Sequence, residues 1–344
     1  MILDEPTSSL NKNEVDLLFD VIRKLRQHGL AIVFITHFLE QAYEIADRIT
    51  VLRNGIVVGE YETEDLPRYE LISKMVGRDL SEKGYFGEGE PAKKTGSTAP
   101  ASGEATLTAR GLGKQGFIHP FDLNVKNGEI LGVAGLLGSG RTEMAKLLFG
   151  VERPDHGEIR ITGRKKRISS PSDAIALGMG FCPENRKEEG VVEELSLREN
   201  IILALQGKMG IFRTIPEKRQ QEIVERFIEV LDIQAHSTEQ EVRTLSGGNQ
   251  QKVMLGRWLA TEPEILLLDE PTRGIDVGAK VEIMDLILQL RERGMAIVFI
   301  SSEFEEVISC SDRIAVLRDK SKIAELSGDE IAEEMILQNI AGGS

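Results

Sequence analysis

One segment of the chain has the residue types and spacing of a phosphate-binding loop. Residues 135–142 read GLLGSGRT, and they stand between an apolar run, Ile130–Ala134, and an amphipathic helical pattern. Glycines let backbone amides converge on phosphate oxygens, and a helix amino terminus adds a favourable dipole. The pattern is G-x-x-x-x-G-K-[ST] with arginine in place of lysine, and its threonine stays available to a phosphate-bound Mg²⁺. A structural glycine turn is the alternative for the loop alone; the candidate nucleotide-binding residues are Gly135, Gly138, Ser139, Gly140, Arg141 and Thr142, with Thr142 also a metal candidate.

A pair of carboxylates follows a second apolar run, at residues 265–268. Asp269 is placed to hold Mg²⁺ through water, and Glu270 is placed to orient an attacking water as a general base. Solvated acids in a turn are the alternative for such a pair standing alone. Because a phosphate loop lies upstream, we expect hydrolysis of a nucleoside triphosphate, with Asp269 as a metal residue and Glu270 as a catalytic one.

A third segment, LSGGNQQK at residues 245–252, leads into an apolar helical pattern. A serine hydroxyl and glycine amides at the start of a helix form an anion site. A helix cap with flexible glycines is the alternative. The spacing to Asp269 favours the anion site, so we expect Ser246, Gly247, Gly248 and Gln250 to contact nucleotide.

An internal repeat indicates which elements position these residues. Residues 3–55 align without a gap with residues 268–320, so that Asp4 matches Asp269 and Glu5 matches Glu270. Runs rich in β-branched residues at 32–36 and 297–301 predict buried parallel strands, and the apolar spacing before each predicts a helix. Strands alternating with helices predict a parallel α/β sheet. We therefore expect two copies of one domain, an incomplete first copy (1–78) and a second copy (106–344), joined by a flexible linker rich in Gly, Pro and Ser (79–105).

The composition restricts the class of protein. The chain has 344 residues, enough for about two domains. Its formal net charge of −14 argues against a general nucleic-acid binder. The longest apolar run, 130–138, is far shorter than the ~20 residues of a membrane helix, and the first ten residues lack the pattern of a secretion signal. Cys182 and Cys310 are interpreted as ordinary thiols in a reducing cytosol.

The three motifs together resemble a known family. LSGGNQQK followed by ILLLDEPT, downstream of a glycine loop, is similar to the nucleotide-binding domain of ATP-binding-cassette (ABC) proteins. That resemblance implies a P-loop NTPase fold with a parallel-sheet core and a helical subdomain at about 183–262. The tandem layout, GRT in the loop and PENRKEEG at 183–190 resemble the ATPases of bacterial monosaccharide importers for ribose, galactose, xylose or galactofuranose.

The resemblance implies cofactors, partners and a location. ATP and Mg²⁺ would be the cofactors, and ATP hydrolysis the activity. Membrane permeases and a periplasmic sugar-binding protein would be the partners, with no nucleic acid, and the chain would sit peripherally on the cytoplasmic face of the bacterial inner membrane. A soluble tandem ATPase acting on ribosomes or DNA is the alternative, disfavoured by a short linker of mixed charge. A non-catalytic nucleotide-binding fragment is a further alternative.

The resemblance also assigns residues that the motifs alone do not. Phe117 becomes the expected adenine-stacking aromatic, with a core phenylalanine as the alternative. Glu184 stands where most cassettes have a glutamine that contacts Mg²⁺ and senses the permease. His37 matches the switch histidine that hydrogen-bonds the γ-phosphate, and Ser302 stands in the matching place of the second copy, where it is too short. In the first copy the implied roles are catalysis for Glu5 and His37 and metal binding for Asp4.

Cassettes of this family pair head to tail, so each ATP is implied to lie between one phosphate loop and an opposing LSGG motif. Arg141 and Ser302 chemically degrade the half-site of the second copy, because arginine is a broad planar fork where lysine is a compact charge. The competent site is then implied to bridge Glu5 and Ser246. The first copy lacks its own loop and LSGG motif, so we expect an amino-terminal truncation, weak ATP hydrolysis by this chain alone, and self-association of second copies as a partial remedy.

Overall fold

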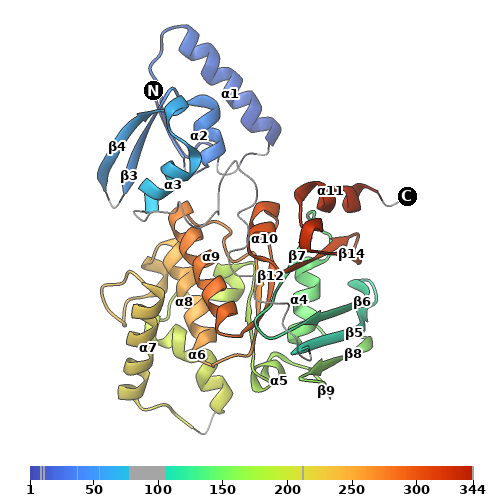
Figure 1. The fold of residues 1–344 in the computed structure, drawn as a ribbon. Coiled ribbons are helices and arrows are strands. Elements are labelled where there is room, and N and C mark those ends of the chain that lie inside the picture. The colour runs from blue at the N-terminus through green and yellow to red at the C-terminus, as the bar shows by residue number, and fades with distance from the viewer. Residues whose placement is uncertain are drawn as a thin grey trace. The chain divides into compact units, whose positions relative to one another are not determined.

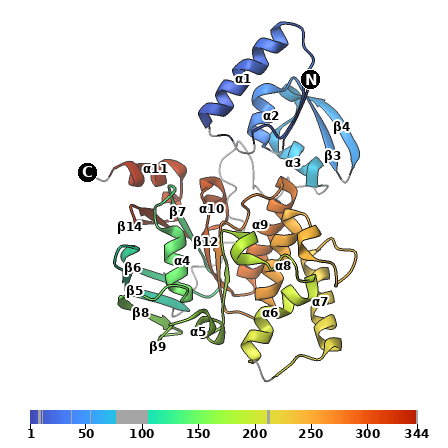
Figure 2. The same cartoon turned by 180° about the vertical axis from the view of Figure 1, so that it is seen from behind.

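The computed structural model describes residues 1–7, 10, 12–36, 38–53, 55–76, 105–210 and 213–342. The expected linker, apart from its last residue, and His37 lie outside these ranges. The chain separates into two compact units, Met1–Thr95 with Asp276–Val281, and Gly96–Ile275 with Glu282–Ser344. Figures 1 and 2 show both units, coloured along the chain.

The smaller unit contains two separate two-stranded sheets. One is parallel, and it pairs β1 (Ile2–Asp4) with β2 (Val33–Ile35). The other is antiparallel, and it pairs β3 (Arg48–Arg53) with β4 (Ile56–Glu62). The predicted helix before β2 is present as α1 (Lys12–Gln27), and it buries Phe19 edge-on against Phe34 with ring centroids 5.9 Å apart. The other elements described in this unit are α2 (Leu39–Ile45), the 3₁₀ turn Thr63–Asp65 and α3 (Arg68–Val76).

The larger unit is built on a six-stranded sheet in the order β10-β11-β12-β7-β13-β14. The first five strands in that order run parallel, and β14 is antiparallel to β13. Every residue of β7, β10, β11 and β12 is buried, as expected for strands covered on both faces. Strand β7 therefore lies between β12 and β13, two strands that come much later in the sequence. The strands are β7 (Ile130–Gly135), β10 (Met179–Cys182), β11 (Ile265–Asp269), β12 (Ala296–Ile300), β13 (Arg313–Arg318) and β14 (Ser321–Ser327).

A second sheet in this unit has four antiparallel strands in the order β6-β5-β8-β9. Helix α4 (Arg141–Phe149) packs on β7, β10 and β11 of the large sheet and on β5 of the small one. Its apolar residues Met144, Leu147 and Leu148 have no exposed surface, so α4 anchors the end of the phosphate loop in the core. The strands are β5 (Leu107–Lys114), β6 (Ile118–Val125), β8 (His156–Ile161) and β9 (Arg164–Lys166).

Three helices, α6, α7 and α8, pack against one another within the range expected for a helical subdomain (Figures 1 and 2). Helix α6 starts at a capping box in which Ser196 and Glu199 satisfy each other's backbone amides. Over the ranges that the structure describes, no helix has both the length and the apolar character needed to cross a membrane. The helices are α5 (Pro171–Ala176), the π turn Arg186–Gly190, α6 (Leu197–Met209), α7 (Glu217–Leu231), the 3₁₀ turn Val242–Thr244, α8 (Gly247–Leu259), α9 (Val277–Glu292), α10 (Phe304–Cys310), the 3₁₀ turn Gly328–Glu330 and α11 (Glu333–Ala341).

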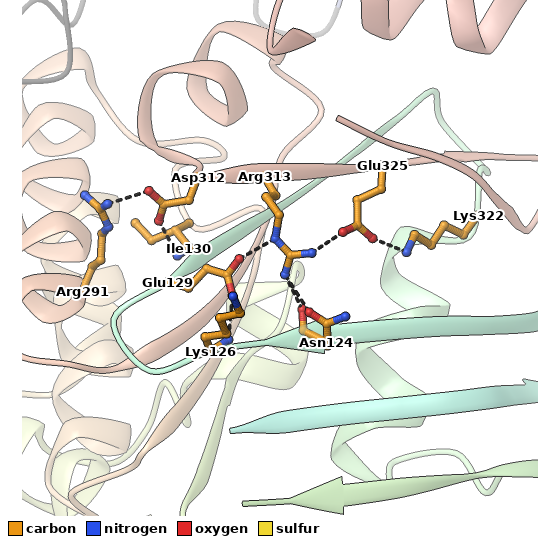
Figure 3. A network of polar contacts seen from close by, with 9 residues as sticks. All are labelled: Asn124, Lys126, Glu129, Ile130, Arg291, Asp312, Arg313, Lys322 and Glu325. Atoms are coloured by element: carbon orange, nitrogen blue, oxygen red, sulfur yellow. Dashed lines mark hydrogen bonds and ion pairs between the residues drawn. The ribbon is translucent and has the colours of Figure 1, made fainter. Parts of the chain in front are cut away.

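Arg313, at the start of β13, joins three parts of the larger unit (Figure 3). Its Nε donates to Glu129 Oε1 at 2.5 Å, just before β7. Its Nη2 donates to the backbone carbonyl of Asn124 in β6 at 2.8 Å and to the Asn124 side chain at 2.9 Å. Its Nη1 is paired with Glu325 in β14, which Lys322 also contacts. The guanidinium therefore fastens β7 and β6 to the hairpin β13–β14.

The neighbouring residue Asp312 continues this network toward α9 (Figure 3). Its carboxylate accepts from the backbone amide of Ile130 at 2.9 Å and pairs with Arg291 Nη2 at 2.5 Å. The start of β7 is thus held by two carboxylates, those of Glu129 and Asp312, each neutralised by an arginine. These contacts fix the strand that leads directly into the phosphate loop.

Candidate functional site

The phosphate loop joins β7 to α4, as the strand–loop–helix pattern predicts. Gly138 and Gly140 have φ values of 78° and 102°, a backbone region that residues with a Cβ adopt at a cost. At Gly135 a Cβ would lie 2.5 Å from both the Leu317 carbonyl oxygen and Ser139 Oγ. Glycine at these places therefore lets the backbone turn tightly before the start of α4, and within this turn the backbone amide of Ser139 donates to the Leu136 carbonyl at 3.0 Å.

Four buried polar atoms around this loop have no hydrogen-bond partner among the described residues. They are Ser139 Oγ, Arg141 Nη1 and both carboxylate oxygens of Asp269. Asp269 is 1% exposed, and burial raises the pKa of its carboxyl group to about 7. The Thr142 side chain and the Arg141 charge oppose this rise in pKa, and the charges of Glu184 and Glu270 add to it. Buried polar groups in proteins are nearly always paired. A donor and a hydroxyl beside an unpaired carboxylate fit a phosphate together with a divalent cation, the groups of a Mg²⁺–nucleotide.

The two motif residues Arg141 and Glu270 form an ion pair inside the site. Arg141 Nη2 lies 3.3 Å from Glu270 Oε1, and both side chains are less than a tenth exposed. Ser302 Oγ donates to the other carboxylate oxygen, Oε2, at 3.0 Å. Burial raises the pKa of Glu270, while Arg141 and the Ser302 contacts oppose that shift. The residue at the lysine position thus holds the carboxylate expected to orient water.

A path of polar contacts leads from the phosphate loop to the start of α8. Thr142 Oγ1 donates to Glu184 Oε2 at 3.3 Å, and Glu184 is ion-paired with Arg273. Arg186 Nη1 donates to the Arg273 carbonyl at 3.4 Å, and its Nε donates to Gln250 Oε1 at 3.3 Å. The fold therefore links the metal candidate Thr142 to the LSGG helix through Glu184 and two arginines.

The LSGG segment forms the start of α8, with Ser246 as its cap. Ser246 Oγ accepts from the backbone amide of Asn249 at 3.4 Å and from its side-chain amide at 2.9 Å, and Ser246 is exposed. Gln250 is buried, and its amide donates to the carbonyls of Val242 and Leu245 at 3.2 and 3.3 Å. Both ends of the Gln250 side chain are therefore occupied by protein groups. Gly247, where a Cβ would lie 3.1 Å from the Arg186 guanidinium, lets that arginine come close.

Phe117 lies between the main core and an open cavity of the larger unit. It is half-buried and packs against the main core. It also lines a cavity of about 310 Å³ formed by residues 114–120, His156 and Lys320. The Lys114 ammonium lies 5.5 Å from the centre of the Phe117 ring. An aromatic wall of this kind is suited to a planar base.

The candidate residues of the first copy lie in the smaller unit. Asp4 ends β1 and Glu5 follows it, and both are exposed. Glu5 has a φ of 42° and Glu270 a φ of 50°, so the two copies place the matching carboxylates on the same unusual backbone conformation. His37 lies outside the described residues.

Three residues with contacts at the site were missed by sequence reasoning. Arg186 donates to Gln250, and Arg273 is ion-paired with Glu184. Lys320 lines the cavity beside Phe117. Arg186 lies within the PENRKEEG segment, but its partner depends on the fold. Lys320 carries a signal in the repeat, because it stands opposite Gly55.

Comparison with known proteins places these features in a family. The pattern of the family described as ABC transporter matches residues 118–273, which contain the phosphate loop, the LSGG motif and Glu270. The galactofuranose transporter ATP-binding protein YtfR of Escherichia coli (strain K12) is 50% identical over 341 residues, covering 99% of this chain and 67% of that protein. The chain belongs to the ABC transporter family. The structure places its phosphate loop, carboxylates and LSGG helix in one unit.

Other relatives in the ABC transporter family are similar over the same span. The fructose import ATP-binding protein FruK of Bifidobacterium longum is 48% identical over 342 residues, covering 99% of this chain and 66% of that protein. The ribose import ATP-binding protein RbsA of Bacillus subtilis is 42% identical over 343 residues, covering 100% and 67%. The chain thus spans about two thirds of the length of the curated relatives it matches.

Solved structures confirm the fold class. A nucleotide-free ATP-binding cassette from an ABC transporter superposes with a TM-score of 0.58 at 21% identity, over 70% of this chain and 96% of that one. A dimeric cassette in a post-hydrolysis state, bound to ADP and phosphate, gives a TM-score of 0.56 at 23% identity, over 64% and 98%. The fold is that of an ABC cassette, a P-loop NTPase with an α/β sheet core, as predicted, and one cassette is matched.

Proposed function

We propose that this chain binds and hydrolyses ATP to energise the import of a monosaccharide through an ABC transporter. The observation that carries the proposal is the set of buried, unpartnered groups at the phosphate loop: Ser139 Oγ, Arg141 Nη1 and the Asp269 carboxylate. They offer a donor set for phosphate next to an acceptor for a cation. Relatives named as fructose, galactofuranose and ribose import proteins support a sugar as the transported substrate.

In this proposal the loop holds the nucleotide's phosphates. The backbone amides of Gly138 and Gly140, the Ser139 hydroxyl and the Arg141 guanidinium bind phosphate oxygens, and Phe117 stacks on the adenine. Thr142 and Asp269 would hold Mg²⁺, which neutralises phosphate charge when it is bound. Glu184, bonded to Thr142, would adjust that site. Ser246, Gly247 and Gly248 would face the nucleotide of an opposing cassette.

Glu270 is the proposed general base, and its burial and hydrogen bonding suit it to accept a proton from water. Burial raises its pKa, so its carboxylate accepts a proton more readily at neutral pH than an exposed glutamate does. Ser302 holds one oxygen, Oε2, at 3.0 Å. For the other oxygen to reach water, Arg141 must turn from Glu270 toward phosphate.

A second candidate function is nucleotide binding with little hydrolysis in this unit. The Arg141–Glu270 ion pair favours it, because the guanidinium occupies the carboxylate that would activate water. Ser302 stands at the position of the switch histidine, and it has no imidazole with which to hydrogen-bond a terminal phosphate. The first candidate function predicts ATP hydrolysis and the second predicts little, whereas both predict that the chain binds ATP.

The tandem arrangement and the partners are also part of the proposal. The gapless repeat supports two cassettes, with residues 1–78 belonging to the first and 106–344 to the second, joined by the linker 79–105. Permease subunits would attach near residues 184–190, a periplasmic protein would deliver the sugar, and the chain would lie peripherally on the cytoplasmic face of the inner membrane. In cells without the permease we expect the chain in the soluble fraction; firm retention in the membrane pellet would contradict peripheral attachment.

Isothermal titration calorimetry of the 344-residue chain with ATP, with and without Mg²⁺, tests the binding function. We expect a Mg²⁺-dependent signal that Asp269→Asn abolishes. Asp232→Asn is the matched control, since Asp232 is an exposed residue with a φ of 49°, which asparagine tolerates. Absence of binding at millimolar ATP would overturn the proposal. Phosphate release per chain, measured at several protein concentrations, tests self-association. A steep rise with protein concentration would support self-association, and a rate per chain that stays constant would oppose it.

A further inference from the structure

The turn between β13 and β14 contains two residues in a backbone conformation that they seldom adopt. Asp319 has a φ of 48° and Lys320 a φ of 62°. In the repeat, Lys320 stands opposite Gly55, which has a φ of 76°. A left-handed conformation costs a residue with a Cβ about 1–2 kcal/mol relative to glycine. The second copy thus carries a lysine where the first copy has the residue that the turn favours.

Backbone contacts on both sides keep Lys320 in this place. The backbone amide of His119 in β6 donates to the Lys320 carbonyl at 2.9 Å. The backbone amide of Lys320 donates to the Ser139 carbonyl in the phosphate loop, also at 2.9 Å. A Cβ on Gly140 would lie 3.0 Å from Lys320 Cα. Lys320 is therefore fixed between the phosphate loop and the strand that follows Phe117.

Lys320 lines the same cavity as Phe117. Its Nζ donates to the Gly116 carbonyl at 3.3 Å, which uses one of the three donors of the ammonium. The other lysine of the cavity wall, Lys114, is ion-paired with Glu152 at 2.5 Å. The charge of Lys114 is thus balanced by a carboxylate, whereas the described contact of Lys320 is to a neutral carbonyl.

We propose that Lys320 is a nucleotide-binding residue whose ammonium binds the first phosphate, at the junction of the nucleoside and the phosphate chain. The junction follows from position, because Phe117 lies on one side of Lys320 and residues 139–140 lie on the other. The inference rests on the proposed function, since it takes ATP as the ligand of this site. Lys320 supplies a compact charge near a loop whose own cation, Arg141, is shared with Glu270.

Titrations of the full chain with three probes, adenosine, AMP and ATP with Mg²⁺, test the proposal in the wild type and in Lys320→Gly. We expect Lys320→Gly to weaken AMP and ATP binding about tenfold or more, as loss of a charged hydrogen bond does, and to leave adenosine binding unchanged. Because glycine relieves the turn, the melting temperature should stay equal or rise. Lys320→Gln, which keeps most of the stem and removes the charge, should show the same loss for AMP and ATP.

Asp319→Gly is the matched control, because it relieves the same turn and leaves the ammonium in place. Its affinities for all three probes should equal those of the wild type. Unchanged ATP affinity in Lys320→Gly would overturn the proposal, as would an equal loss for adenosine and ATP, which would make Lys320 a wall of the base pocket alone. Absence of ATP binding by the wild type would instead overturn the proposed function.

Discussion

The Arg141 guanidinium and the Glu270 carboxylate lie 3.3 Å apart, and both are nearly buried. The first stands at the cation position of the phosphate loop, and the second follows strand β11, so the pair joins the two chemical motifs of the larger unit. A nucleotide's phosphates would compete with Glu270 for the same guanidinium. Binding of ATP and release of the Glu270 carboxylate are therefore expected to be coupled.

Glu270→Gln tests this coupling. Removing one partner of a buried ion pair costs about 3–5 kcal/mol, so the nucleotide-free variant should melt at a lower temperature than the wild type. Mg²⁺–ATP should then raise the melting temperature of the variant more than that of the wild type, because phosphate no longer competes with a carboxylate for Arg141. Thermal unfolding with and without ATP measures both effects. An ATP-induced shift no larger than that of the wild type would contradict the competition, and Ser302→Ala serves as a control that leaves Arg141 paired.

Asp269 should make stability depend on pH. Its carboxyl pKa is raised from 3.8 to about 7 in the folded chain, so between these values the folded state holds a proton that the unfolded state has released. The free energy of unfolding of the metal-free wild type should therefore fall as the pH rises from about 4 to 7. Asp269→Asn lacks this group, and its advantage over the wild type should grow to at most about 4 kcal/mol by pH 8. Urea unfolding at pH 5 and pH 8 checks this, and an equal difference at both would count against the burial argument.

Glu184→Gln should move that pH dependence without removing it. The Glu184 charge helps to raise the pKa of Asp269, so its loss should shift the pH midpoint to a lower value. The stability change itself should be about 0–1 kcal/mol, because the Arg273–Glu184 pair is largely exposed on the arginine side. Glu189→Gln removes a surface carboxylate that is paired with Lys146 at 3.0 Å, and it should leave the midpoint in place. A midpoint that Glu184→Gln does not lower would refute the electrostatic contact.

Arg313→Leu should be strongly destabilising. It leaves the Glu129 carboxylate, 8% exposed, without the guanidinium that neutralises it, at a cost of about 3–5 kcal/mol (Figure 3). Lys165→Met is the comparison, because Lys165 pairs with Glu158 at 2.8 Å on the surface with a side chain 68% exposed. Its effect should be about 0–1 kcal/mol. Chemical unfolding measures the loss of unfolding free energy in both variants. Equal losses would show that burial of the carboxylate partner does not set the size of the effect.

The parts of the site that sequence predicted best depend on local chain geometry. An apolar run, a glycine loop and an amphipathic helix are consecutive, so their order alone indicated β7, the phosphate loop and α4. The apolar runs at 265–268 and 297–301 likewise became β11 and β12, each within a residue of its expected bounds. The repeat added the parallel pairing of these strands, since each copy carries the same alternation of strand and helix.

Contacts between distant segments were beyond the sequence. Arg141 was assigned to phosphate and Glu270 to water, and their mutual ion pair follows only from the packing of β11 beside α4. A nearer contact was also missed: the side-chain amide of Gln250, which we expect to contact nucleotide, donates to the carbonyls of Val242 and Leu245. Arg273 was missed because its role comes from the place of Glu184 in the fold, which no spacing rule conveys.

The strand order of the large sheet affects how this unit is made on the ribosome. β7 leaves the ribosome before any other strand of that sheet, yet both of its neighbours, β12 and β13, are synthesised much later. Until residue 318 has emerged, the backbone amides and carbonyls on one edge of β7 have no strand to pair with. Such pairing between distant segments is slow and exposes apolar strands in the meantime. The nascent chain should therefore depend on chaperone binding between synthesis of the phosphate loop and synthesis of the β13–β14 hairpin.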